Sequence, residues 1–156
     1  MKSKQMFSKK LDKKDIAIIN ELNKDARASF RKIARKLGVA TTTVINKYNR
    51  LKKLGIIKST APIIDREKVG YGLTAAIEII VSKGKLMEVE KKIAKMPRVF
   101  AVYDITGEPD ALILACFRTR AELNDFVKSL LVMPCIERTN THFVLNTVKE
   151  DFRVFV

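Results

Sequence analysis

The chain has 156 residues, 47% of them hydrophobic, which suits one or two globular domains and excludes a wholly disordered protein. Residues 1–60 hold 17 basic and 4 acidic residues, a net charge of +13, whereas residues 61–156 hold 14 and 13. No apolar run approaches the 18 residues of a membrane-spanning helix and the start lacks the apolar core of a signal peptide, so we expect a soluble, cytoplasmic protein.

The first ten residues contain four Lys and no acidic residue, which predicts a mobile basic tail. A solvated start with no role and a non-specific contact to phosphate both fit this composition. We therefore place the first domain boundary after residue 10.

The next segment carries the start and stop signals of three short helices. Asp12 followed three positions later by Asp15 is typical of a capping box, and Ser29 is placed to cap a second helix that Gly38 ends. A third helix is predicted from residue 41 to 54, with Gly55 closing it. The inward apolar positions are Ile16, Ile19 and Leu22 in the first helix, Phe30, Ile33, Ala34 and Leu37 in the second, and Val44, Tyr48, Leu51 and Leu54 in the third.

The order and spacing of these elements predict a winged helix-turn-helix domain over residues 11–64. Ala34, Gly38 and Val44 have the spacing with which two helices approach, turn and pack. Residues 56–64 are predicted to form a β-hairpin, the wing, around residues 59–62. A polar linker is expected at residues 65–72.

Residues 73–156 contain an internal repeat. Strands are predicted at residues 73–81, 99–105, 111–117 and from about 136 to 148, with one helix between the first two and one between the last two. Two Met-Pro pairs, at 96–97 and 133–134, lie 37 residues apart. This βαββαβ order predicts a ferredoxin-like domain, so the fold class is α+β.

The third of these strands, ALILACF, is apolar on both faces. In a ferredoxin-like domain both helices cover one face of the sheet, so the other face needs a different cover. We expect a second copy of the chain to supply it, which makes the protein a homodimer. The alternative is that this segment is a helix. The two sides are Ala111, Ile113, Ala115 and Phe117, and Leu112, Leu114 and Cys116.

The third helix is the predicted reader of double-stranded DNA, because its outer side is polar and the charge excess surrounds it. Its first residues would approach base edges in a major groove, and Asn46 suits adenine. Lys47 and Arg50 can reach guanine or phosphate, and Arg31 and Lys32 phosphate. A polar solvated face is the plain alternative. The predicted DNA-binding residues are Thr41, Thr42, Thr43, Asn46, Lys47, Arg50, Arg31 and Lys32.

The turn of residues 107–110 and its neighbours carry groups that fit a small molecule. Asp110 can accept the ammonium of an amino acid, and backbone N–H groups near Gly107 can bind its carboxylate, with hydroxyls from Thr106 and Thr141 nearby. The alternative is an ordinary hairpin turn in which Asp110 caps the backbone.

Little in the chain supports metal, redox or enzyme chemistry. Cys116, Cys135 and His142 are too few for a zinc site, and we expect them to be structural. No nucleophile with a base, phosphate-binding glycine loop or acid pair is apparent, so we expect no catalysis and no cofactor. An RNA-reading sheet would need aromatics in its third strand, which offers only Phe117.

Residues 11–72, LDKKDIAIINELNKDARASFRKIARKLGVATTTVINKYNRLKKLGIIKSTAPIIDREKVGYG, resemble the DNA-binding half of the Lrp/AsnC (feast/famine) transcriptional regulators. VYDITGEPDALILACF and RTNTHFVLNTVK resemble the strands of that family's effector-binding and assembly domain. The resemblance implies dimers, often assembled into tetramers or octamers, with DNA binding modulated by amino acids or related metabolites. Two positions differ from the family pattern: Ala40 stands where serine is usual, so Thr41 is expected to cap the helix, and Lys47 stands where arginine is frequent.

The resemblance also places a ligand site between subunits at the Gly-x-x-Asp turn. The expected effector-binding residues are Thr106, Gly107, Glu108, Pro109, Asp110 and Thr141. The sequence thus predicts a sequence-specific, effector-modulated transcriptional regulator. The alternative function is an architectural protein that coats DNA with little sequence preference.

Overall fold

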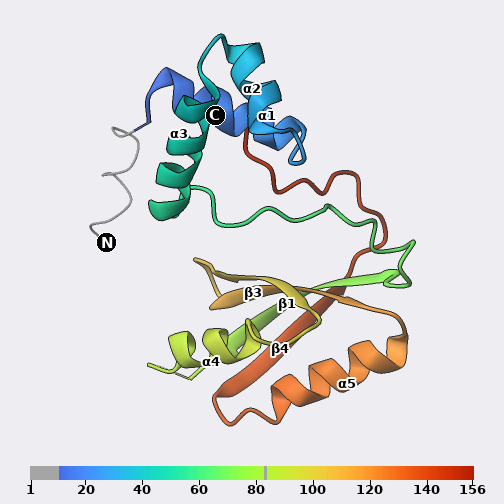
Figure 1. The fold of residues 1–156 in the computed structure, drawn as a ribbon. Helices are drawn as coiled ribbons and strands as arrows, with labels where there is room; N and C mark the ends of the chain where they lie inside the picture. The colour runs from blue at the N-terminus through green and yellow to red at the C-terminus, as the bar shows by residue number, and fades with distance from the viewer. Residues whose placement is uncertain (1–10, 83) are drawn as a thin grey trace. The chain divides into compact units, whose positions relative to one another are not determined.

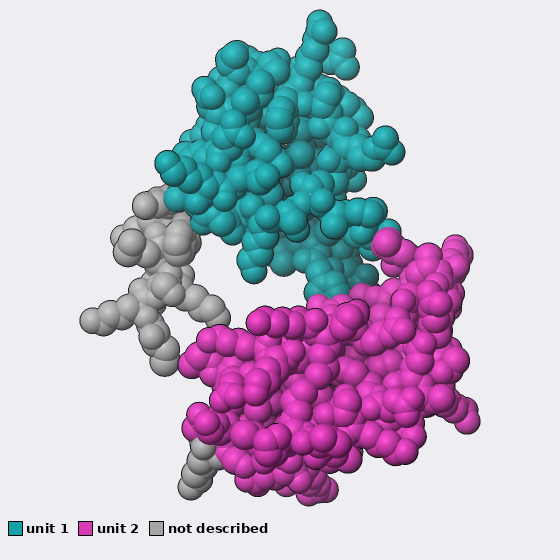
Figure 2. Space-filling view, turned by 60° about the horizontal axis from the view of Figure 1, so that its bottom comes forward, with its two compact units in different colours: residues 1–63, 150–156 teal, residues 64–149 magenta. Residues whose placement is uncertain are grey.

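The computed structural model describes residues 11–82 and 84–156, so the predicted basic tail lies outside it. The chain divides into two units, drawn in different colours in Figure 2. Residues 11–63 and 150–156 form the helical unit, and the described residues of 64–149 form the sheet unit. Residues 65–72, expected as a linker, belong to the sheet unit, where the Arg66 guanidinium lies 3.8 Å from the centroid of the Phe100 ring.

The helical unit contains α1 (Lys13–Lys24), α2 (Phe30–Leu37) and α3 (Thr41–Lys53) (Figure 1). The predicted capping box at the start of α1 is confirmed, because the Asp15 and Asp12 backbone N–H groups each donate to the other's carboxylate at 2.9 Å. The Ser29 hydroxyl accepts from the Lys32 N–H at 3.2 Å, and Gly38 ends α2 at φ 64°. These local signals therefore fix where the helices begin and end.

The core of this unit is small and shared by all three helices. Ile18, Ile33 and Val44 are buried, and Leu51 is also fully covered. The buried face of α1 differs from the predicted one. Ile16, Ile19 and Leu22 are only half-buried, and Ile18 is the residue of α1 that lies at the centre of the core. A helix that packs against two neighbours has a wider apolar face than one stripe, so spacing alone does not single out its most buried position.

The predicted wing is wrong: in the segment between α3 and β1 (Leu73–Val81), all of which is described, there is no strand. The Ile56 N–H donates to Leu51 O at 3.0 Å and the Gly55 N–H to Lys52 O at 2.9 Å, which closes the end of α3. Residues 58–64 are exposed, and Pro62 has no N–H to donate. A two-stranded hairpin with nothing packed on it is marginal, so the domain is a helix-turn-helix without a wing.

Residues 150–156, which we expected in the ferredoxin-like domain, lie instead in the helical unit. The Asn20 amide accepts from the Val156 N–H at 3.0 Å and donates to the Val156 carbonyl at 2.6 Å. The Asn23 amide donates to the Val154 carbonyl at 2.8 Å. Side-chain amides on α1 thus bind the backbone of this segment.

The sheet unit has the predicted ferredoxin-like order of elements. Its sheet has the order β2-β3-β1-β4, and all neighbouring strands are antiparallel. The strand β4 ends at Phe143 and not near residue 148, because Phe143 pairs with Ala75 and β1 begins two residues earlier, at Leu73. The elements after β1 are α4 (Leu86–Ile93), β2 (Val99–Asp104), β3 (Ala111–Phe117), α5 (Arg120–Leu131) and β4 (Ile136–Phe143).

Both helices of the sheet unit cover one face of the sheet (Figure 1). The strand prediction for residues 111–117 is confirmed, and every second side chain from Ala111 to Phe117 is fully buried under α4 and α5. Leu112, Leu114 and Cys116 point to the other face and are half-buried. In the part of the chain that the structure describes, no helix combines the length and apolarity needed to cross a membrane.

Candidate nucleic-acid interface and ligand site

The start of α3 differs from the sequence prediction. Ala40, not Thr41, is the N-cap, and no side chain makes a capping hydrogen bond there. The first N–H groups of an α-helix have no partner within the helix, and the helix dipole makes this end electropositive. An uncapped helix start of this kind is suited to an anion such as a phosphate.

The residues predicted to read bases share one side of α3. Thr42 and Asn46 are exposed and Thr43 is half-buried, whereas Val44 is fully covered on the opposite side. Ile45 lies among them, 36% exposed, and was missed by the sequence prediction although an apolar residue between polar ones on an outer face is a visible signal. The face therefore offers hydroxyls, an amide and an aliphatic group to one surface.

A basic hollow of about 480 Å³ separates α2 from the start of α3. The predicted residues Arg31, Lys32 and Thr41 line it. Arg35, which the prediction omitted, also lines it and lies four positions after Arg31 on α2, one turn along the same face. The Lys32 ammonium lies 3.4 Å from Asp25, but both groups are exposed, and such surface pairs contribute only about 0–1 kcal/mol.

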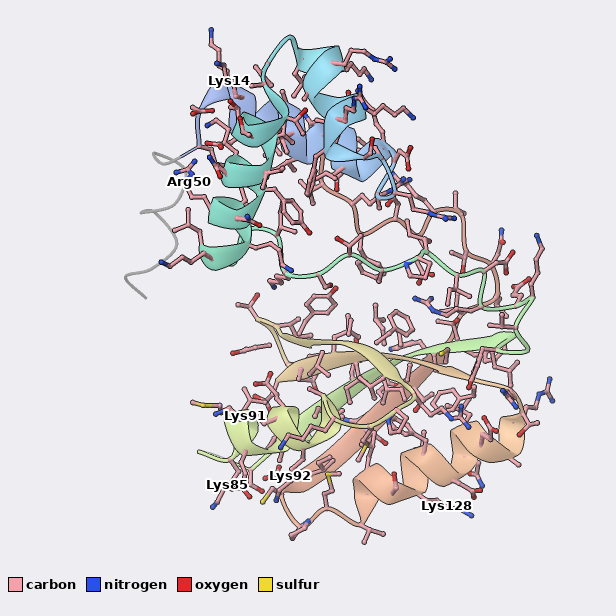
Figure 3. All side chains as sticks on the ribbon, viewed as in Figure 1. Lys14, Arg50, Lys85, Lys91, Lys92 and Lys128 are labelled. Carbon is pink, nitrogen blue, oxygen red and sulfur yellow. The ribbon has the colours of Figure 1, made fainter. Side chains whose placement is uncertain are left out.

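The structure places Lys47 and Arg50 away from this hollow, in an ion cluster with the first turn of α1. Lys47 Nζ lies 2.5 Å from Asp12 Oδ2 and 3.1 Å from Asp15 Oδ1, and its side chain is only 18% exposed. Arg50 Nη2 contacts Asp15 Oδ2, and Figure 3 shows the Arg50 side chain extending from α3 toward the start of α1. The hydrogen bond from Lys47 lowers the pKa of Asp12 from 3.8 to about 2, and its counterpart raises the pKa of Lys47.

Asp110, the last residue of the turn of residues 107–110, is hydrogen-bonded to β1. Asp110 Oδ2 accepts from the Val81 N–H at 2.7 Å, and the Asp110 N–H donates to Ile79 O at 2.9 Å. The register between β1 and β4 shifts at Val81, and an irregular register leaves backbone groups without a partner in the ladder. The Asp110 carboxylate accepts the hydrogen bond of the Val81 N–H there. Gly107 has φ 124°, which L side chains rarely adopt. The Asp110 carboxylate and the Asp110 N–H therefore both bind the backbone of β1.

Replacing Asp110 with Ala is expected to lower the free energy of unfolding of the sheet unit by about 1–3 kcal/mol, because the Val81 N–H loses its acceptor. Asp110→Asn keeps an acceptor oxygen and should retain most of the stability. Denaturant unfolding of both variants measures the difference. Equal stability of wild type and Asp110→Ala would show that the hydrogen bond is dispensable.

A hollow of about 80 Å³ opens on the face of the sheet that the helices do not cover. Of the six predicted effector residues, Glu108 and Pro109 line it. Thr141 lies on the opposite face, because it pairs with Ile77, whose side chain points to the helices. The hollow that Thr141 lines is a different one, with Arg120, Leu123, Asn124, Val127 and Phe143.

Four residues that line the open-face hollow were missed: Glu78, Ile80, Arg138 and Asn140. The alternation of β4 is the signal that could have found them, since Asn140 pairs with Glu78 and Arg138 with Ile80. The Asn140 amide donates to Glu78 Oε2 at 3.0 Å, and this bond, followed by His142 at 3.3 Å, lowers the pKa of Glu78. The hollow thus combines carboxylates with a guanidinium, the complement of an amino acid's two charges.

Residues 11–82 and 84–156 bring together no group of three His, Cys, Asp or Glu side chains that could hold a metal ion. Cys116 and Cys135 are both half-buried.

Two protein-family models match the chain. The AsnC-type helix-turn-helix domain matches residues 11–52, and the Lrp/AsnC ligand binding domain matches residues 74–154. An uncharacterized HTH-type transcriptional regulator from Pyrococcus abyssi is 44% identical over 144 residues, which is 92% of this chain and 98% of that protein. The HTH-type transcriptional regulator FL11 of Pyrococcus horikoshii is 36% identical over 140 residues, 90% of this chain and 93% of that protein.

Solved structures show the same architecture. A transcriptional regulator from Neisseria meningitidis, crystallised as a complex with L-Met, has a TM-score of 0.83 at 26% identity and covers 92% of this chain and 96% of that one. LrpC of B. subtilis has a TM-score of 0.79 at 26% identity, with 91% and 99% covered. AsnC of E. coli, at 23% identity and a TM-score of 0.82 with 90% and 96% covered, shares the fold.

Proposed function

Because this chain belongs to the Lrp/AsnC family of transcriptional regulators, we propose that it binds specific DNA sequences as a homodimer or higher oligomer and responds to an amino acid or related metabolite. The family consists of regulators and not of enzymes. Its helix-turn-helix domain supports DNA binding, and its second domain is of the ligand-binding type.

The observation that carries the DNA-reading proposal is the exposed polar face at the uncapped start of α3. A major groove about 12 Å wide admits one helix, whose first residues come nearest the base edges. Asn46 can donate to and accept from adenine, and Ile45 can contact a thymine methyl group. Thr41, Thr42 and Thr43 offer hydroxyls to bases or phosphates, and Thr41 and Thr42 lie at the helix end whose first N–H groups have no partner within the helix.

Phosphate binding is proposed for the basic hollow beside that face. Arg31, Lys32 and Arg35 line the same hollow as the start of α3, so one strand of the duplex can follow them while α3 enters the groove. The charge of the first 60 residues, 17 basic against 4 acidic, favours a polyanionic partner over a neutral one.

A homodimer is proposed through the sheet. Leu112, Leu114 and Cys116 form an apolar stripe on the face that no helix of the unit covers. A second copy packed there would bury it and would supply a second α3. The operator should then be nearly palindromic, with half-sites one helical turn of about 34–36 Å, or a multiple of it, apart. Dimers can assemble further into tetramers or octamers.

The amino-acid site is proposed at the open-face hollow. Its volume of about 80 Å³ is well below the roughly 300–1,000 Å³ of ligand pockets, so a second subunit would have to complete it. Arg138 would bind the carboxylate of the ligand, and Glu78 or Glu108 its ammonium. The Neisseria relative was crystallised with L-Met, which supports an amino acid as the ligand class.

Arg138→Ala is expected to remove the effect of amino acids on DNA binding and on the size of the complexes. Arg120→Ala is the matched control, because Arg120 lines the other hollow, beside Thr141. Titration of wild type and both variants with a panel of amino acids, read by calorimetry and light scattering, measures this. Loss of the response in Arg120→Ala alone would move the site to the other hollow.

The test of sequence-specific binding is selection of bound duplexes from a random pool, followed by two variants. Asn46→Ala should relax the preference at one base position at a cost of about 1–3 kcal/mol. Lys32→Ala should weaken all sequences alike and flatten the dependence of log Kobs on log salt by about one per protomer. Equal losses on selected and random DNA for Asn46→Ala would remove it from the base readers, and a chain without any preference would be architectural.

A further inference from the structure

The ion cluster of Asp12, Asp15, Lys47 and Arg50 joins the first turn of α1 to the middle of α3. Asp15 is its centre: Oδ1 accepts from Lys47 Nζ at 3.1 Å, and Oδ2 accepts from the Asp12 N–H at 2.9 Å and from Arg50. Asp15 is fully buried. Among the residues that the structure describes, no other charged residue is buried. A buried carboxylate is tolerated only when it is paired and hydrogen-bonded, so these contacts are required by its burial.

Lys47 is therefore engaged before any DNA arrives. Its ammonium lies between two carboxylates, and its side chain is only 18% exposed. To reach a phosphate it would have to leave both, exposing two acidic groups to the polyanion. A phosphate contact by Lys47 would thus replace two ion pairs with one and leave two carboxylates that repel the phosphates.

The position of the cluster on α3 gives it a different role. Lys47 directly follows Asn46, and Arg50 lies four residues after Asn46, one turn along the helix. Val44 and Leu51 hold the other side of α3 in the core. Contacts on two different sides of a helix fix its rotation about its own axis, and a rotated α3 would carry the Asn46 amide away from a base edge.

We propose that Asp15 is a specificity-determining positioning residue, which acts through Lys47 and Arg50 to set the angle at which α3 presents Asn46 to DNA. Lys47 makes no contact with phosphate. The inference builds on the proposed function, and it reassigns two residues that the sequence pattern had placed on the nucleic acid.

The first test compares Lys47→Met with Lys32→Met on one duplex selected by the wild-type chain and on one random duplex. For Lys47→Met we expect the ratio of the two affinities to fall about tenfold, comparable to the loss of one base contact, while the salt slope is unchanged. Lys32→Met should leave the ratio unchanged and reduce the slope by about 0.9 per protomer. The unfolded fraction cancels in the ratio, so a purely structural role would not move it.

Conservative and double variants complete the test. Lys47→Arg keeps the pairing with Asp15 and should restore the ratio. Asp15→Asn should lower the ratio as Lys47→Met does, and the double variant should lower it no further, because both act through one cluster. Circular dichroism at the binding temperature identifies any variant that does not fold.

Three results would overturn the proposal in distinguishable ways. A slope reduced by about 0.9 per protomer in Lys47→Met, with equal losses on both duplexes, would make Lys47 a phosphate contact. An unchanged ratio with a lowered melting temperature would make the cluster purely structural. A wild-type chain that selects no duplex would contradict the proposed function, and the inference with it.

Discussion

Replacing Asp15 with Ala is expected to lower the free energy of unfolding of the helical unit by about 3 kcal/mol. Removing one partner of a buried ion pair costs about 3–5 kcal/mol. The lower end applies here because Arg50, 43% exposed, can turn its charge to water, while Lys47 keeps Asp12 as a partner. The same substitution removes one half of the capping box of α1.

Amide hydrogen exchange of α2 and α3 measures this loss without interference from the sheet unit. Asp25→Asn is the matched control, since it removes the same charge from an exposed pair with Lys32, and such pairs contribute about 0–1 kcal/mol. Protection of the helical unit that is the same in Asp15→Ala and Asp25→Asn would show that the buried cluster adds no more than a surface pair.

Replacing Arg31, Lys32 and Arg35 together with Ala is expected to weaken binding to every duplex and to reduce the salt slope by about 2.7 per protomer. Each phosphate contact contributes about 0.9 to that slope, because one neutralised phosphate releases its condensed counterions. All three side chains line the basic hollow beside the start of α3. The ratio between selected and random duplexes should remain unchanged, since phosphate contacts carry no sequence information.

The control for this triple variant removes the same charge from the sheet unit. Lys91, Lys92 and Lys128 lie on α4 and α5, where Figure 3 labels them, and their replacement with Ala should leave the salt slope nearly unchanged. Fluorescence anisotropy with labelled duplexes between 50 and 300 mM salt gives both slopes. A slope reduced equally by both variants would show that total charge, and not the hollow at α3, determines binding.

The helix and strand pattern of this chain could be read closely because its signals are local. The capping pair Asp12 and Asp15, the Ser29 cap and Gly38 each act within a few residues, and the structure contains all of them. The alternation of β3 likewise gave the two sets of side chains that share a face, but both sets are apolar, so the pattern did not tell which set is fully buried. The prediction of a wing was wrong because a strand depends on a partner strand, which is not a local signal. Residues 56–64 have the composition of strands but form no strand pair.

Site residues were predictable where their position depends only on which face of a single helix or strand they lie on. Helical spacing was enough to place Thr42 and Asn46 on the outer face of α3. It could not reveal that Lys47 meets Asp12, because those residues are 35 positions apart and come together only through packing. Thr141 was wrongly placed beside the turn of residues 107–110. The face of the sheet on which it lies depends on its pairing with Ile77, and that pairing cannot be read from the sequence of β4 alone.

The central claim is that the segregated positive charge serves a helix that reads DNA sequence. Equilibrium binding of the full chain to a duplex selected from a random pool, and to a random duplex of equal length at the same salt, tests it most directly. The account predicts a difference in affinity of about 10³ or more. A difference below about tenfold would contradict it.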